Sequence, residues 1–166
     1  ISNNCYITSL SPLNNLKKLK KLFCANNSLE KIDFSSFNLT FADFSNNNIT
    51  TFYNHDQFPA IECLLLNYNK IETIPKTEFS SILSLYISGN PIEIMPTQQQ
   101  FPNIVCLYCS ETPFNSKVTD LRLLYQFPKL KLLNSHFVTP QQHQKAKQSF
   151  NGIVFVEDVQ GLIGDN

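Results

Sequence analysis

The sequence predicts an α/β fold, a right-handed solenoid with a parallel sheet along its concave side and a helical cap at its C-terminal end. Three observations predict it. A pattern of apolar positions recurs along the first two-thirds of the chain, the recurrence breaks after residue 114, and the segment that follows carries helix start and stop signals. A fixed period of 20 to 50 residues is the sequence signature of repeat folds, in which each unit buries its apolar face against its neighbours.

The pattern is L-x-x-L-x-L-x-x-N-x-L, and several segments match it in register. Their first residues lie 20, 22, 21 and 22 positions apart. The matching segments are 19–29, 39–49, 61–71, 82–92 and 104–114. This template and this period are typical of leucine-rich repeats. We therefore identify the chain as a leucine-rich repeat protein.

Within each repeat, positions three to five form a short strand whose side chains alternate between the core and the concave surface. Position nine turns inward, where an amide or hydroxyl can satisfy backbone groups that the bend after the strand leaves unpaired. These position-nine residues form a structural ladder: Asn27, Asn47, Asn69, Asn90 and Thr112. A second column precedes most repeats by three residues and is expected to fill the convex side of the core: Leu16, Phe58, Phe79, Phe101 and Phe127, with Phe37 displaced by one. Prolines in the convex segments predict extended or 3₁₀ pieces there.

The period breaks in the C-terminal stretch. A helix carrying Leu121 and Leu124 is expected to lead into a last strand around 129–134, and a second helix begins with Thr139 as its N-cap and Pro140 in its first turn. Such an element seals the end of a solenoid core. We expect one structural domain: leucine-rich repeats over 1–114, with the first repeat truncated, a C-terminal cap over 115–150 and a tail over 151–166.

At the other end, Ile1 falls at position five of a repeat whose first four positions are missing. A solenoid that began in the middle of a strand would expose its core and an open sheet edge. More repeats or an N-terminal cap are therefore expected upstream.

The C-terminal element resembles the cap of the intracellular leucine-rich repeat family with short repeats of about 22 residues. The residues that carry the resemblance are Leu124-Tyr125, Pro128, Leu130, Leu133-Asn134, Val138-Thr139 and Ala146. This family includes the type-one phosphatase regulatory subunit, the spliceosomal A-prime protein, the tubulin-folding cofactor and the axonemal dynein leucine-rich light chain. One departure is Asn134-Ser135, where family caps often carry Asp-Gly. The resemblance implies membership of a larger complex, which could be spliceosomal, phosphatase-related or cytoskeletal and axonemal.

The residues that the template points outward on the concave side are unusually apolar and aromatic. The predicted partner-binding residues are Phe23, Phe41, Asp43, Leu65, Tyr68, Tyr86 and Tyr108. Tyrosine combines a large contact area with a polar tip, and large exposed apolar patches mark interfaces. We predict that this face binds a helix or loop of another protein. The alternative is that the rings only pack against one another across strands, or are covered by the tail.

The composition excludes several other functions. The chain has 166 residues with 13 basic and 13 acidic side chains, whereas nucleic acids and anionic membranes attract proteins with a cationic excess. The four glycines match neither dinucleotide-binding nor P-loop spacing. No apolar run reaches the length of a membrane span. We expect no direct nucleic-acid partner and no membrane segment, and the lysines at 17, 18, 20 and 21 are interpreted as a solvated edge.

No catalytic, cofactor or metal site is predicted. His55, His136 and His143 are scattered, and no Ser or Cys nucleophile has a base beside it. Cys106 and Cys109 are spaced like a metal or redox pair, but residues three apart on a strand face opposite sides. The chain is therefore expected to be no enzyme and to need no cofactor.

Cysteine usage favours a reducing compartment. Five cysteines is an odd number, and the disulfide-bonded flanking caps of secreted leucine-rich repeat proteins are absent from the sequence. The template leaves Cys63 and Cys106 as exposed thiols on the concave face. The expected location is the cytoplasm, the nucleus, or the cilium and cytoskeleton. Two alternatives stay open: a regulatory repeat segment of a larger kinase or phosphatase, and a secreted recognition or adhesion protein with glycan on Asn48.

Overall fold

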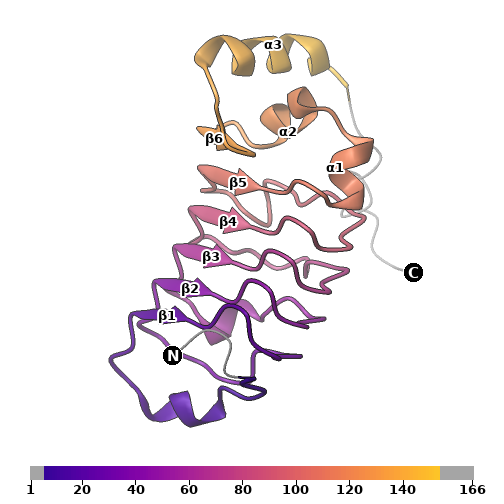
Figure 1. The fold of residues 1–166 in the computed structure, drawn as a ribbon. Coiled ribbons are helices and arrows are strands. Elements are labelled where there is room, and N and C mark those ends of the chain that lie inside the picture. The colour runs from indigo at the N-terminus through magenta and orange to yellow at the C-terminus, as the bar shows by residue number, and fades with distance from the viewer. Residues whose placement is uncertain (1–5, 154–166) are drawn as a thin grey trace, which may run out of the picture.

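The computed structural model describes residues 6–153, which form a curved stack of repeats along one sheet (Figure 1). The strands are β1 (Lys21–Phe23), β2 (Phe41–Asp43), β3 (Cys63–Leu65), β4 (Ser84–Tyr86), β5 (Cys106–Tyr108), β6 (Leu132–Leu133) and β7 (His136–Phe137). They follow one another in chain order, parallel from β1 to β6, and β7 pairs with β6 antiparallel. Strands β1 to β5 occupy positions three to five of the five repeats, so the predicted fold class is confirmed.

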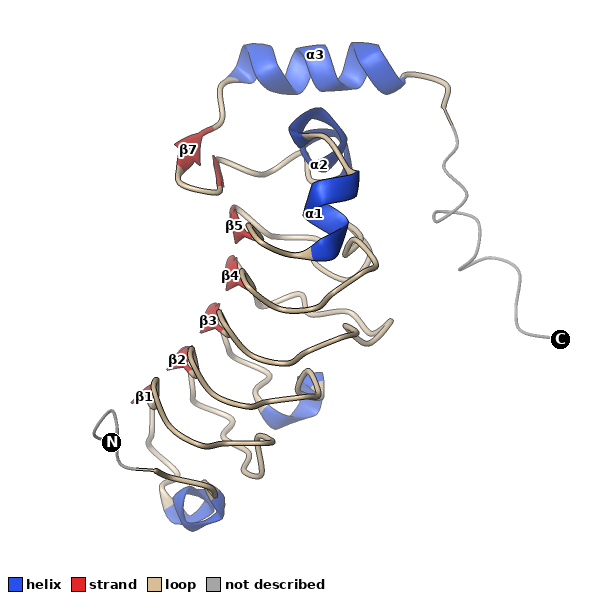
Figure 2. Cartoon of the chain, turned by 45° about the vertical axis from the view of Figure 1, so that its right-hand side comes forward, coloured by secondary structure: helices blue, strands red, loops and turns tan. Residues whose placement is uncertain are grey.

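Equivalent template positions pair across neighbouring strands. Leu64 lies opposite Leu85, which lies opposite Leu107, and all three are fully buried. Since a strand alternates its side chains between two faces, this register stacks the position-four leucines in one apolar column and turns their neighbours outward. The strands line the concave side of the curve, and the loops and short helices lie on the other side (Figure 2).

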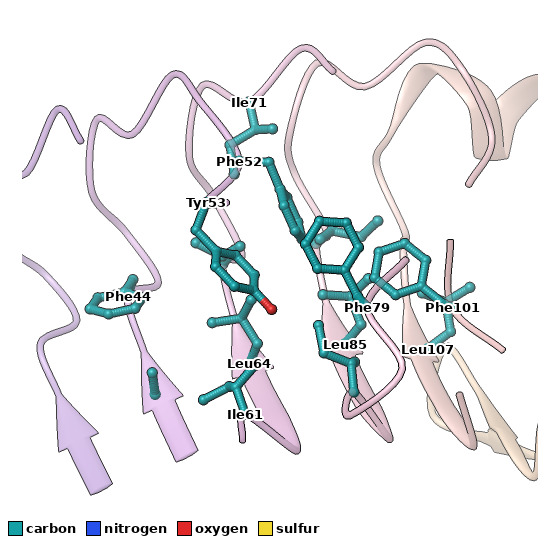
Figure 3. Close-up of a cluster of buried hydrophobic side chains, with 14 of the residues drawn as sticks. Phe44, Phe52, Tyr53, Ile61, Leu64, Ile71, Phe79, Leu85, Phe101 and Leu107 are labelled. Atoms are coloured by element: carbon teal, nitrogen blue, oxygen red, sulfur yellow. The ribbon is translucent and has the colours of Figure 1, made fainter. Parts of the chain in front are cut away.

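Aromatic rings from the convex loops fill the space behind the sheet (Figure 3). Phe79 stacks on Phe101 with ring centroids 5.2 Å apart, and Phe52 meets both rings edge-on. Phe58 and Phe127 of the predicted column are buried as well. Each buried phenylalanine contributes about 1.5–3 kcal/mol to folding through the apolar surface it removes from water.

The same column prediction is wrong for Leu16 and Phe37. Leu16 is 50% exposed and Phe37 is 76% exposed. In the second repeat the buried residue three positions before the start is Ser36, and the displacement by one residue turns the side chain of Phe37 outward. The ring of Phe34 enters the core instead, with its centroid 5.0 Å from that of Phe58.

The convex segments contain short 3₁₀ helices, as their prolines predict. These are η1 (Ser11–Asn15), which begins with Pro12 in its first turn, and η2 (His55–Gln57). A capping box lies at the N-terminus of η2, where the side chain of Gln57 accepts a hydrogen bond from the main-chain N–H of Asn54 at 2.9 Å.

Three α-helices form the C-terminal cap: α1 (Pro113–Lys117), α2 (Asp120–Gln126) and α3 (Pro140–Phe150). Helix α3 begins as predicted. The hydroxyl of Thr139 accepts from the N–H of Gln142 at 3.3 Å, and the Gln142 side chain accepts from the Thr139 N–H at 2.8 Å. It lies across the end of the stack next to α2 and buries Ala146 (Figure 2).

The pattern did not predict α1 or β7. Helix α1 starts from the last ladder residue, Thr112, whose hydroxyl accepts from the N–H of Asn115. Residues 1–5 of the truncated first repeat and residues 154–166 of the predicted tail lie outside the described residues.

Candidate partner-binding face

We define the concave face as the outward residues at positions three and five of β1 to β5, together with Tyr68 at its rim. All seven predicted partner-binding residues lie on it. Position five forms one row across the strands, with Phe23 opposite Asp43, then Leu65, Tyr86 and Tyr108. The row is continuous because the parallel register holds equivalent residues side by side.

Two aromatic clusters lie at the two ends of this row. Phe23 is 52% exposed, and its ring centroid lies 4.9 Å from that of Phe41 on the next strand. Tyr86 and Tyr108 stack nearly parallel, with centroids 4.5 Å apart and planes 13° from one another. The aromatic residues of the concave face therefore form two separate clusters with Asp43 and Leu65 between them.

The tyrosine cluster is also a polar site. The Cys106 thiol donates a hydrogen bond to the Tyr86 hydroxyl oxygen, with the two atoms 3.6 Å apart. Partial burial, followed by this hydrogen bond and the neighbouring thiols and phenol, raises the pKa of Tyr86. The phenol therefore stays neutral and can both donate to and accept from a partner group.

Asp43 is the charged group of the row, between Phe23 and Leu65. Its Oδ1 accepts a hydrogen bond from the main-chain N–H of Ser45 at 3.0 Å, so the carboxylate is oriented by its own repeat. It is half-buried between the phenylalanine cluster and Leu65. A partner that covers this row must bring a donor or a cation to the carboxylate, because an unpaired buried charge is costly.

Tyr68 lies at the rim because its backbone is left-handed, a feature that the repeat template does not include. It occupies position eight, and every residue of that column adopts a left-handed backbone with φ between +54° and +67°. The column is Asn26, Asn46, Tyr68, Gly89 and Glu111. The signal was present, because Asn and Gly are the residues that tolerate this conformation best. The Tyr68 hydroxyl donates to the Glu111 carboxylate at 3.4 Å.

The structure adds one aromatic residue to this side of the molecule. Phe137 in β7 is 84% exposed and lies directly opposite Leu132 of β6. Residues opposite one another in an antiparallel pair project to the same side of the sheet, and Leu132 occupies the outward position three. Phe137 therefore extends the concave face beyond β5, which no repeat-based pattern could indicate because β7 lies outside the repeats.

The thiols differ from expectation at one position. Cys63 is half-buried on the concave face, but Cys106 is only 8% exposed, so the prediction of two exposed thiols is wrong for Cys106. Its sulfur lies against Tyr86, which covers it. Cys109 faces the core on the other side of the sheet, where burial raises its pKa to about 12.

The side chains of the ladder residues form hydrogen bonds with main-chain groups. The Asn47 side chain accepts from the Leu29 N–H and donates to the carbonyls of Cys24 and Phe44, each within 3.0 Å. Equivalent bonds recur at Asn69 and Asn90, and Thr112 donates to the Cys109 carbonyl. The asparagines therefore join successive repeats, whereas Thr112 bonds within its own repeat and caps α1.

Each histidine has a local role. His55 lies 2.9 Å from the carboxylate of Asp56, whereas ring nitrogens of His136 and His143 lie 2.9 and 2.7 Å from main-chain carbonyls. Over residues 6–153, no cluster of three or more His, Cys, Asp and Glu side chains could hold a metal ion. None of the helices in this part of the chain is both long and apolar enough to cross a membrane.

Comparisons with protein-family models and with curated proteins find no match. Among solved structures, the chain is similar to a chain in the crystal structure of the Drosophila melanogaster SNF/U2A' complex. The match covers 96% of this chain and 83% of that one, with a TM-score of 0.58 and 19% sequence identity. At this identity the likeness concerns the fold. The chain therefore has the leucine-rich repeat fold, a solenoid with a parallel concave sheet and a helical C-terminal cap.

Proposed function

We propose that this protein is a non-catalytic scaffold that binds a helix or loop of a partner protein on its concave face. The observation that carries the proposal is the pair of aromatic clusters, Phe23 with Phe41 and Tyr86 with Tyr108, on the open side of the sheet. The fold buries its core without them. A partner that covers apolar surface gains about 25 cal/mol of binding free energy for each Å² that it removes from water.

The dimensions of the row suit a helix. Neighbouring strands lie about 4.8 Å apart, so the row from Phe23 to Tyr108 spans about 19 Å. A helix rises about 1.5 Å per residue, so roughly 13 residues cover this length. One apolar stripe of such a helix can contact both clusters, and a Lys, Arg or amide donor between them can reach Asp43.

Lateral packing within each cluster is the competing explanation of these rings. Phe23 and Phe41 do contact one another, as do the two tyrosines. Packing of this kind leaves the outer ring faces open, however, and Phe23 and Tyr68 keep half of their surface exposed. The other alternative, cover by the tail, lies outside the described residues. The similar fold in the SNF/U2A' structure belongs to a complex, and this supports a protein partner for the present chain.

Affinity capture with the wild type and the Tyr86→Ala/Tyr108→Ala variant tests the proposal. Loss of the two aromatic contacts at one end of the row is expected to cost on the order of 2 kcal/mol or more, a weakening of about 30-fold. Ile94→Ala is the matched control, because Ile94 is exposed but lies on the loop after β4, away from the concave face. Retention of every partner by the double variant would contradict a concave site. Collapse of its melting transition would instead place the tyrosines among the residues that the fold requires.

Thiol alkylation gives a second readout. Cys63 is half-buried on the concave face, whereas Cys109 is buried in the core. A bound partner is expected to slow modification of Cys63 by iodoacetamide and to leave Cys109 as protected as before. Unchanged labelling of Cys63 in the complex would place the partner elsewhere.

A further inference from the structure

The zero net charge conceals an uneven distribution along the solenoid. Residues 6–31 carry five lysines and one glutamate, whereas residues 32–111 carry eight acidic residues and two lysines. The N-terminal end of the described chain is therefore cationic and the middle of the molecule is anionic. Charges of one sign gathered in one place attract the opposite charge on a partner.

An apolar pocket lies beside these lysines. It is lined by Leu16 and Lys17 ahead of β1 and by Phe37 and Asn38 ahead of β2, and it encloses about 210 Å³. Leu16 and Phe37 are the two side chains that leave the core column described above. Leu16 is half exposed, and Phe37 is about three-quarters exposed. We call this surface the N-terminal pocket.

Side-chain hydrogen bonds hold the two walls of the N-terminal pocket together. Asn14 accepts from the main-chain N–H of Ser35 at 3.0 Å, and the Asn38 amide donates to the Lys17 carbonyl at 2.8 Å. Both bonds link the first repeat to the second. The apolar walls are therefore positioned by the fold before any ligand arrives, which lowers the entropic cost of binding.

The lysines around the pocket are open to solvent. Lys17, Lys18 and Lys20 are exposed. Within the part of the chain that the structure describes, the one salt bridge joins His55 and Asp56, so these three ammonium groups have no carboxylate partner there. A ligand that brings carboxylates to them therefore has no existing salt bridge to displace within residues 6–153.

We propose that the N-terminal pocket binds a short acidic segment of a partner protein, which inserts one apolar side chain between Leu16 and Phe37. The volume is below the 300–1,000 Å³ of small-molecule pockets and suits one or two side chains. The carboxylates on either side of the inserted residue pair with Lys17 and Lys18. This site is distinct from the concave face. Its lining residues belong to the segments before β1 and β2, whereas the concave face consists of strand residues and Tyr68.

Fluorescence anisotropy with synthetic peptides tests the site. The probe is a fluorescein-labelled peptide with a central Phe-Leu pair between runs of glutamate, compared with one carrying Ala-Ala at the centre and one with lysine runs. We expect the first peptide alone to bind. Leu16→Ser/Phe37→Ser and Lys17→Glu/Lys18→Glu are each expected to weaken its binding about tenfold or more. Added salt is expected to weaken it too, since exposed ion pairs are screened.

Matched controls come from elsewhere on the surface. Ile94→Ser removes another exposed apolar side chain, and Lys145→Glu/Lys147→Glu reverses two exposed charges on α3. Both controls should bind the peptide like the wild type. Absence of peptide binding to the wild type, or equal weakening by control and pocket variants, overturns the proposal. Phosphatidylserine vesicles and single-stranded RNA are assayed in parallel, and tighter binding of either through the same residues would also overturn it.

Discussion

Tyr68 lies across Gly89, and the two residues fit together because Gly89 has no side chain. A Cβ on Gly89 would lie 2.7 Å from Cε1 of Tyr68, closer than real Cβ contacts. Gly89 also has φ of +67°, a backbone conformation in which residues other than glycine are strained. The position of Tyr68 at the rim of the concave face thus depends on a glycine in the next repeat.

Gly89→Ala is expected to lower the free energy of unfolding by about 2 kcal/mol and to displace the Tyr68 ring. Backbone strain accounts for about 1 kcal/mol of this, and the collision with the ring for the rest. Urea denaturation measures the loss. Gly152→Ala is the control, since Gly152 has φ of +77° but no atom within 4 Å of the position of a Cβ. Equal losses in the two variants would show that the ring contact contributes nothing.

Asn69 shows how much a ladder residue contributes. Its Oδ1 accepts from the Ile49 N–H at 3.0 Å, and its Nδ2 donates to the carbonyls of Phe44 and Leu66 at 3.0 and 3.1 Å. Asn69→Ala leaves the buried Ile49 N–H unpaired, at about 1–3 kcal/mol, whereas the Phe44 and Leu66 carbonyls keep the hydrogen bonds from Asn47 and Asn90. We expect a loss of about 1–3 kcal/mol in urea denaturation, against less than about 0.5 kcal/mol for the exposed Thr50→Ala. A small loss at Asn69 would mean that water replaces the amide.

The sequence predicts those parts of the molecule in which neighbouring repeats share the same pattern of apolar and polar positions. Strands β1 to β5 and the ladder follow from the template, because each repeat can bury its apolar face only against an equivalent face in the same register. Phe37 departs from the column by one residue, and a pattern cannot show that Phe34 takes its place in the core. Tertiary packing decides between the two rings.

The candidate site follows the same division. Alternation along the strands was sufficient to place Phe23 and Tyr86 on the concave side. The exposure of each side chain, however, depends on contacts between strands, which the alternation pattern does not show. The prediction of an exposed Cys106 is wrong because Tyr86 on the neighbouring strand covers its thiol. Phe137 was missed because a hairpin beyond the last repeat brings it to the face.

The buried thiol of Cys109 makes stability fall at alkaline pH. Burial raises its pKa to about 12 in the folded chain, from 9.0 for an ordinary thiol. Between these values the unfolded chain releases the proton and the folded chain keeps it. The stabilisation is therefore complete below about pH 9 and is lost as the pH rises towards 12, at up to about 1.4 kcal/mol per pH unit.

Cys109→Ala removes this contribution. We expect its free energy of unfolding, measured by urea titration from pH 8 to pH 10.5, to fall less steeply than that of the wild type. The slope is the readout, because the cavity left by the thiol lowers stability at every pH. Identical slopes would show that the thiol ionises alike in the folded and unfolded chains.

Ser135 offers a stabilising substitution in the cap. Asn134 and Ser135 form the two-residue turn between β6 and β7, with φ of 45° and 70°. A hairpin turn with both values positive favours Asn followed by Gly, and a serine in this conformation costs about 1–2 kcal/mol. Glycine relieves that strain, although it adds about 0.4–1 kcal/mol of entropy to the unfolded chain. We therefore expect Ser135→Gly to raise the free energy of unfolding by about 0.5–1 kcal/mol.

Asn134→Gly is the matched control in the same turn. Its backbone is also left-handed, but asparagine tolerates this conformation, and its side-chain Oδ1 accepts a hydrogen bond from the Cys109 N–H at 2.8 Å. Loss of this bond costs about 1–3 kcal/mol, because the N–H belongs to a strand end next to the core. Denaturant titration should therefore give opposite signs for the two glycine variants. A gain in both would mean that the side chain of Asn134 does not hold the hairpin against β5.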